Sequence, residues 1–116
     1  MTDVPSAREV LAGELDRISE RLSRTEADGK DVFFEGSDSY DRAIVAVIRL
    51  AALFEDDRRF GALLSDVTER ERVGIRNTRN ITAHHGYASM DDETFWETIT
   101  VDMPAFVAKL RAVKGL

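Results

Sequence analysis

The segment from Thr68 to Tyr87 holds the side chains of this chain that are best suited to chemistry. It reads T-E-R-E-R-V-G-I-R-N-T-R-N-I-T-A-H-H-G-Y and contains both histidines of the protein. Arginine binds phosphate oxygens through a planar fork of donors, and histidine exchanges a proton near neutral pH. The combination indicates a site that binds phosphate and moves protons.

A helix is expected to carry these residues. Thr68 and Glu71 have the spacing of a capping box, in which each side chain satisfies a backbone donor of the other. Gly86 can adopt the left-handed conformation that ends a helix, so the helix should end between His84 and Gly86. At about 100° per residue, one stripe of this helix contains four polar residues at four-residue intervals, with Arg79 beside them: Arg72, Arg76, Asn80 and His84.

RNA is a substrate on which such a site could act without a metal, because its 2′-hydroxyl is an internal nucleophile. Two other interpretations fit the same residues. In the first, the helix is a solvated charged helix, with Glu69 and Glu71 paired to the arginines and the histidines near its C-terminal cap. In the second, His84 and His85 bind a metal, but neighbouring helix residues point about 100° apart and no third ligand has a telling spacing. The sequence therefore predicts no metal site and no cofactor.

Length, composition and charge set the broad class. The 116 residues support one domain, 1–116, with 43% hydrophobic and 33% charged residues, as in folded soluble proteins. The net charge of −6 argues against an extended nucleic-acid groove and favours a local basic site. There is no cysteine, no N-terminal signal pattern and no apolar run of the roughly 20 residues that a membrane span needs. A cytoplasmic protein is expected.

The N-terminal half predicts two helices. Apolar residues at three- and four-residue spacing indicate a helix from Ser6 to Arg24, followed by a loop from Thr25 to Asp31 and an apolar plug, Phe33 and Phe34. Ser37, Asp38 and Ser39 are good N-caps for a second helix that runs to Glu55.

The second helix also predicts assembly. Only Arg49 is charged between Ala43 and Phe54, so this helix should be buried on all sides. A small domain seldom buries such a helix alone, which predicts a symmetric dimer packed across it. Arg49 is expected either to extend to the surface or to reach the polar site.

The C-terminal half completes an all-α fold. A short third helix is expected over Phe60 to Val67, before the arginine-rich helix. From Phe95 to Val113 the helical period continues, with a kink or break at Pro104 and Asp102 as a cap. No segment alternates long enough to be a strand. The prediction is a small up-and-down bundle of four to five helices.

The motif resembles a known family. R-N-I-T-A-H-H-G-Y is similar to the Arg-x(4–6)-His motif of the HEPN superfamily, and more narrowly to the Arg-Asn-x-x-x-His-x-Tyr motif of the HepT-like family. The tail M-D-D-E-T-F-W-E-T-I-T-V-D-M-P, with Trp96, Ile99, Asp102 and Pro104, also resembles that family, as does S-Y-D-R-A. The likeness spans most of the chain.

The resemblance implies a fold and a function. HepT-like proteins are all-α dimers that cut RNA without metal as toxins of toxin–antitoxin pairs. Their antitoxin is a MntA-like minimal nucleotidyltransferase, which adds AMP to the motif tyrosine. In this chain Arg79, with Arg76 and Arg72 as further phosphate ligands, would bind the scissile phosphate. Asn80 would orient the phosphate or the imidazole, and Tyr87 would be the modified residue.

The motif histidine has two candidates. Arg79 reaches His84 across four residues, the usual gap of the family, and His85 across five. The segment His85-Gly86-Tyr87 keeps the family's spacing to Trp96, which favours His85 and leaves His84 as the alternative. Where the family often has Gly-Glu in the second helix, this chain has Arg49-Leu50, so no carboxylate is expected there.

The resemblance supports an endoribonuclease toxin. An alternative function is a non-catalytic subunit that presents substrate to a minimal nucleotidyltransferase, since related small helical proteins carry a similar motif.

Overall fold

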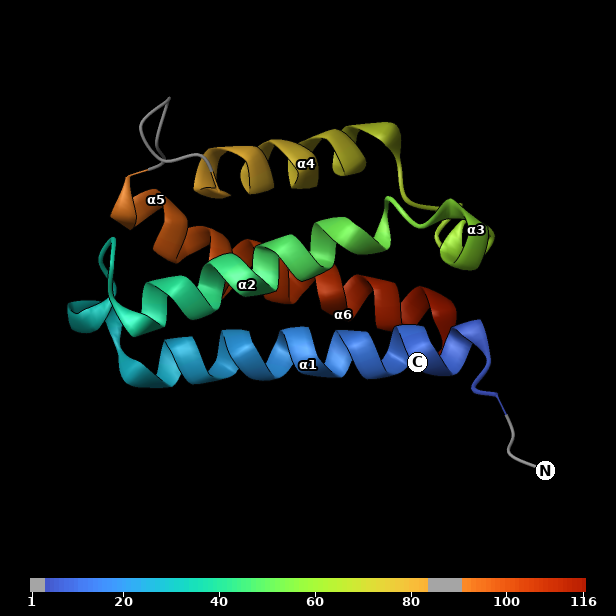
Figure 1. Cartoon of the computed structure of the whole chain (residues 1–116), viewed down its shortest axis with the longest axis horizontal. Helices are drawn as coiled ribbons and strands as arrows, with labels where there is room; N and C mark the ends of the chain where they lie inside the picture. Colours follow the sequence, from blue (N-terminus) through green and yellow to red (C-terminus); the bar gives the residue numbers. More distant parts are fainter. Residues whose placement is uncertain (1–3, 84–90) are drawn as a thin grey trace.

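Helices make up all the regular secondary structure of residues 4–83 and 91–116, the part of the chain that the computed structural model describes (Figure 1). The elements follow in the order α1 (Ala7–Asp28), the 3-10 turn η1 (Lys30–Val32), α2 (Asp38–Leu53), α3 (Asp57–Phe60), α4 (Glu69–Ala83), α5 (Asp92–Glu97), the π-helical turn η2 (Thr98–Asp102) and α6 (Met103–Lys114). The predicted all-α class is confirmed.

The first helix is longer than predicted. It continues past Arg24 to Asp28, so the expected loop from Thr25 to Asp31 is wrong over its first half. Thr25 is fully buried, and its hydroxyl donates a hydrogen bond of 2.8 Å to a carbonyl one turn earlier. A polar residue is thus satisfied inside the helix. Gly29, with φ of 93°, ends it.

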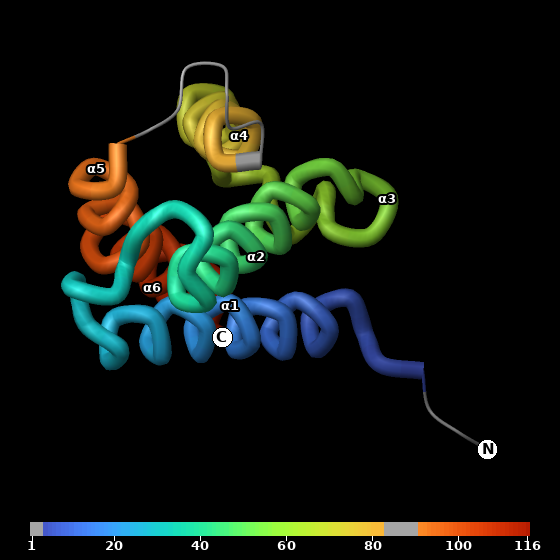
Figure 2. Tube along the Cα trace, turned by 60° about the vertical axis from the view of Figure 1, so that its left-hand side comes forward, coloured from blue at the N-terminus to red at the C-terminus, as the bar shows by residue number. Residues whose placement is uncertain are grey.

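The core lies where α1, α2 and the C-terminal helices meet, as Figures 1 and 2 show. Each helix contributes one buried stripe at helical spacing, as in amphipathic helices of globular proteins. The main buried residues are Leu11, Leu15, Ile18 and Leu22 of α1, Ala43, Ala46, Val47 and Leu50 of α2, and Phe95, Ile99, Met103, Val107 and Leu110 of the C-terminal segment.

Aromatic rings close one end of the core. The ring of Phe33 lies 5.1 Å from that of Tyr40 and 5.4 Å from that of Phe95, centroid to centroid. Burial of Tyr40 raises the pKa of its phenol, with nearby carboxylates adding to the effect. The predicted apolar plug is therefore confirmed for Phe33 and wrong for Phe34, which is exposed.

The second helix begins as predicted, because the Ser37 hydroxyl accepts a 3.1 Å hydrogen bond from the Tyr40 N–H. It is not buried on all sides, however. Val45 and Ile48 are 39% and 41% exposed, so one stripe of α2 faces outward in this chain. The dimer stays a prediction, and the exposed stripe of α2 is the surface through which the two copies would pack.

Arg49 of α2 extends to the surface, the first of its two expected paths, with a side chain that is 37% exposed. It forms a two-point ion pair with Glu14 of α1, with Nε–Oε1 and Nη2–Oε2 distances of 2.6 and 3.0 Å. The fork of arginine fits a carboxylate in this way, and the contact raises the pKa of Arg49. Arg49 therefore joins α1 to α2.

The connection between α2 and α4 contains less helix than predicted. The side chain of Asp56 accepts a hydrogen bond from the Arg59 N–H and starts α3, which ends at Phe60. Gly61, a poor helix former, follows at once, and the chain continues through turns to the start of α4. Leu64 and Val67 are buried from this turn segment, so the apolar pattern indicated burial correctly and helix incorrectly.

The C-terminal segment bends without breaking. Pro104 has no N–H and would leave an α-helical carbonyl unpaired, and the π-helical turn η2 precedes it. Asp102 was predicted to cap the last helix, but it has helical backbone angles and makes no capping hydrogen bond. The predicted interruption is real, and its form is a wider helical turn.

Candidate functional site

Helix α4 carries the predicted site and lies on the outer side of α2 (Figure 2). Its start is as predicted. The Thr68 N–H donates to the Glu71 carboxylate, and the Glu71 N–H donates to the Thr68 hydroxyl, both at 3.1 Å. Arg72 and Arg76 border the same hollow, in agreement with their four-residue spacing.

Arg72 is occupied by the protein itself. Its guanidinium donates to the carbonyls of Leu64 at 2.6 Å and Val67 at 3.3 Å, and it lies 5.3 Å from the centroid of the Phe54 ring. These contacts tie α4 to the turn segment that precedes it. A phosphate on Arg72 would have to compete with two main-chain acceptors.

Arg76 is the more accessible arginine. Its side chain is 52% exposed, and its one described ion pair is to Glu69, at 3.7 Å from Nη2 to Oε1. Exposed pairs of this kind are worth about 0–1 kcal/mol, so Arg76 can exchange its partner for another anion at low cost.

Arg79 is half-buried between two partners. Its Nη1 forms an ion pair with Glu55, which follows α2, and its Nε and Nη2 donate to the Asn80 Oδ1 at 3.3 and 3.2 Å. The structure thus places the guanidinium of Arg79 against the side chain of its neighbour Asn80. It adds Glu55, a carboxylate that the sequence did not place there.

A polar hollow of about 200 Å³ lies between α2 and α4. Arg72 and Arg76 line it together with three carboxylates: Glu55, Asp57 and Glu69. The three carboxylates outnumber the two arginines of this hollow. An anion that enters must compete with Glu69 at Arg76, or with main-chain carbonyls at Arg72.

Three predicted site residues, His84, His85 and Tyr87, lie outside the described residues, of which Ala83 is the last before them. Their assigned roles stay predictions. Within the described residues no group of three or more histidine, cysteine, aspartate or glutamate side chains is arranged to hold a metal ion.

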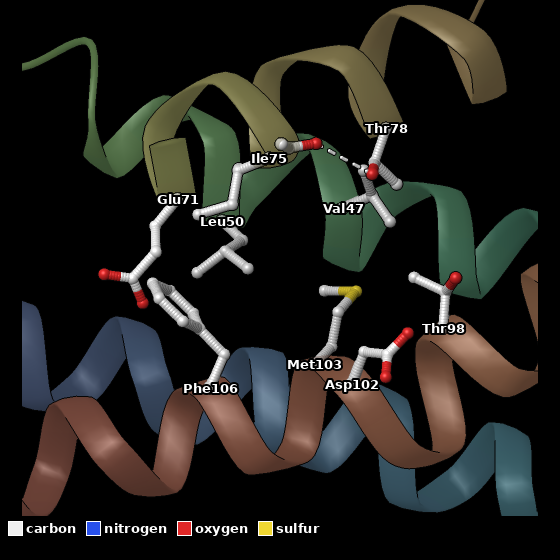
Figure 3. Close-up of a pocket in the computed structure, with 10 residues that line it drawn as sticks. Val47, Leu50, Glu71, Ile75, Thr78, Thr98, Asp102, Met103 and Phe106 are labelled. Atoms are coloured by element: carbon white, nitrogen blue, oxygen red, sulfur yellow. Dashed lines mark hydrogen bonds between the residues drawn. The ribbon is translucent and has the colours of Figure 1, made fainter. Parts of the chain in front are cut away.

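A second, larger hollow was not predicted. It measures about 310 Å³ and lies between α2, α4 and the C-terminal helices (Figure 3). Its lining is mostly apolar: Val47, Leu50, Ile75, Met103 and Phe106, with Glu71, Thr78, Thr98 and Asp102 at its polar edges. Gly74 also lines this hollow and has open space where a side chain would stand. A glycine inside a helical segment is the sequence signal that could have indicated the hollow.

Glu71 forms one edge of this apolar hollow. The Lys109 Nζ lies 2.9 Å from its Oε2 and, together with the Thr68 backbone, holds the pKa of the Glu71 carboxyl below its usual value. Glu71 thereby links the start of α4 to α6. Its charge is satisfied by structural partners.

Comparison of the chain with protein-family models, curated proteins and solved structures finds no match. Among the described residues, no helix has both the length and the apolar character that crossing a membrane requires.

Proposed function

We propose that this chain is a HepT-like, metal-independent endoribonuclease, the toxin of a toxin–antitoxin pair. The observation that carries the proposal is Arg79, the arginine of the R-N-I-T-A-H-H-G-Y motif. Its guanidinium pairs through Nη1 with a carboxylate, that of Glu55, and a phosphate oxygen can take the place of a carboxylate oxygen at an arginine. Asn80, the next motif residue, contacts the same guanidinium.

In the proposed reaction the 2′-oxygen of RNA attacks the adjacent phosphorus and the 5′-oxygen of the next nucleotide leaves. One histidine, His85 or His84, takes the 2′-hydroxyl proton, and a proton is returned to the leaving 5′-oxygen. Arg79 stabilises the extra negative charge of the phosphorane, Arg76 holds a neighbouring phosphate, and Asn80 orients Arg79. The products are a 2′,3′-cyclic phosphate and a 5′-hydroxyl.

Regulation and assembly complete the proposal. A cognate MntA-like nucleotidyltransferase would transfer AMP from ATP to the Tyr87 oxygen, with release of pyrophosphate. The added phosphodiester charge next to Arg79 would occupy the position that RNA needs. A homodimer across the exposed stripe of α2 would place two α4 helices on one assembly.

The test is RNA cleavage by purified protein in EDTA. Arg79→Ala should lower the cleavage rate by about two orders of magnitude or more, because the charge stabilisation of the transition state is lost. Arg24→Ala, which removes an exposed arginine of α1, should cleave like the parent. The ends of the products should be cyclic phosphates.

Separate His84→Ala and His85→Ala variants identify the motif histidine by which of them loses activity. If the folded parent cleaves no RNA in EDTA and still binds a minimal nucleotidyltransferase, the nuclease proposal fails. The chain would then be the substrate-binding subunit.

A further inference from the structure

Glu55 occupies an unusual place for a carboxylate. It directly follows Phe54, which ends α2, and its N–H donates to the Ala52 carbonyl at 3.2 Å. The C-terminal end of a helix carries partial negative charge, so an acidic side chain is electrostatically disfavoured there. The neighbouring Asp56 has a clear structural task as the N-cap of α3. The described partner of Glu55 is Arg79.

Each of the three guanidinium nitrogens of Arg79 has a partner in this arrangement. Glu55 faces Nη1, and the single oxygen Oδ1 of Asn80 is shared by Nε and Nη2 at 3.3 and 3.2 Å. Both distances to Asn80 are long for hydrogen bonds between nitrogen and oxygen. The charged contact to Glu55 is therefore the one that an incoming anion must replace.

The exposures of the two partners differ. The side chain of Glu55 is 57% exposed, whereas that of Arg79 is 25% exposed. A carboxylate with access to water can leave the pair and be hydrated at low cost, since exposed ion pairs contribute little. Arg79, which is packed more tightly, would remain in place to receive another anion.

We propose that Glu55 is an intramolecular competitor for the anion site of Arg79. Its carboxylate takes the position of a phosphate oxygen in the unoccupied protein, and an oxyanion binds by displacing it. The identity of that oxyanion as a phosphodiester of RNA rests on the proposed function. The competition itself does not rest on that function, because any oxyanion that binds Arg79 must displace the same carboxylate.

Binding of a non-cleavable RNA tests this competition. The probe is a short fluorescent single-stranded RNA with 2′-O-methyl groups, which removes the nucleophile and so separates binding from cleavage. Its affinity is measured by fluorescence anisotropy at low, fixed ionic strength. Glu55→Gln keeps the shape of the side chain and removes its charge, so it should tighten binding about two- to fivefold, the range set by an exposed ion pair.

Two control variants make the result specific. Asp57→Asn removes one negative charge from the same hollow, and Asp57 is not one of the partners described for Arg79, so the gain in affinity should be smaller. In the Arg79→Ala background, Glu55→Gln should give no gain, because the site for which Glu55 competes is absent. The thermal midpoint of Glu55→Gln should match that of the parent, since the residue is exposed.

Weaker binding by Glu55→Gln would overturn the proposal and make Glu55 a residue that positions Arg79. Unchanged binding would overturn it as well, because a competitor that is removed must raise the affinity. An equal gain from Asp57→Asn would overturn it as well, since the effect would then be general charge. Cleavage of unmodified RNA is measured separately. A protein that gains affinity through Glu55→Gln but cleaves nothing would support the competition and contradict the nuclease.

Discussion

Arg72 and Arg79 belong to the same helix and differ in what holds them. Arg72 donates to two main-chain carbonyls, whereas Arg79 pairs with an exposed carboxylate side chain, that of Glu55. Carbonyl groups in a turn cannot move away without unfolding it, and a glutamate can change its rotamer. Of the three arginines that the sequence assigned to phosphate, Arg79 and Arg76 are thus the ones whose protein partners are side chains.

Arg72→Lys should therefore destabilise the protein. A lysine cannot donate in fixed directions to both the Leu64 and Val67 carbonyls, and an unsatisfied acceptor costs about 1–3 kcal/mol. The thermal midpoint, measured by circular dichroism, should fall by roughly 4 °C or more. Arg76→Lys, which changes an exposed arginine with one loose ion pair, should stay within about 0.5 kcal/mol of the parent.

The opposite pattern would change the role of Arg72. If Arg72→Lys were as stable as the parent and bound RNA more weakly, the arginine would be a phosphate ligand and its carbonyl contacts would be incidental.

At the scale of elements, α2 carries an outward stripe that nothing in the described chain covers. Val45, Ile48 and Ala52 are exposed and follow one another at three- and four-residue spacing, the pattern by which one helix packs on another. Arg59 and Asp56, a pair of opposite charges, lie near one end of this stripe. Such a surface suits a second copy in which α2 meets α2.

Ile48→Glu should dissociate the expected dimer. A carboxylate at the centre of the stripe would be buried twice across a symmetric interface, without a partner for either charge. In sedimentation velocity at micromolar concentration the parent should be a dimer and the variant a monomer. Val113→Glu, at an exposed valine of α6, should leave the dimer intact. A parent that sediments as a monomer would remove the shared-site hypothesis.

Local signals predicted the elements well where the local chain decides the structure. The capping box of Thr68 and Glu71 and the cap at Ser37 depend on residues three apart, and both are confirmed. The extension of α1 through Thr25 and the ion pair of Arg49 with Glu14 depend instead on contacts between residues that are distant in the sequence. Arg79 and Asn80 were predicted from the motif and stay predictions as site residues. Glu55 was not predicted, because only the packing of α2 against α4 brings it to Arg79.

For the molecule as a whole, the candidate site stands on α4, a helix that packs mainly against one other helix. Helix α1 packs against α2, α3, η2 and α6, whereas the main contact of α4 is with α2 (Figures 1 and 2). The apolar hollow beneath α4 further reduces the contacts that hold it. A segment with few buried contacts opens at a lower free energy than the core does.

Amide hydrogen exchange should show this difference. Peptides from α4 should exchange through local opening, faster than peptides from residues 11–22 of α1, which should exchange only when the whole protein unfolds. Mass spectrometry over a time course resolves the two classes. Equal protection of α4 and α1 would mean that an interface between copies, or packing beyond that described, holds α4 as firmly as the core.

The π-helical turn before α6 has a consequence for insertions and deletions. Phe95, Ile99, Met103 and Val107 are all buried at four-residue spacing, which in an ordinary helix drifts by about 40° per step. The Met103 N–H reaches back five residues to the Thr98 carbonyl, so this turn holds one residue more than an α-helical turn and keeps the buried face aligned. A related chain that is one residue shorter here would present the same buried face through a regular α-helix. It would also have to lack Pro104, because proline inside an α-helix leaves a carbonyl unpaired and its ring clashes with the carbonyl four residues earlier. A one-residue gap in an alignment of such chains would then belong inside this helix and not in a loop.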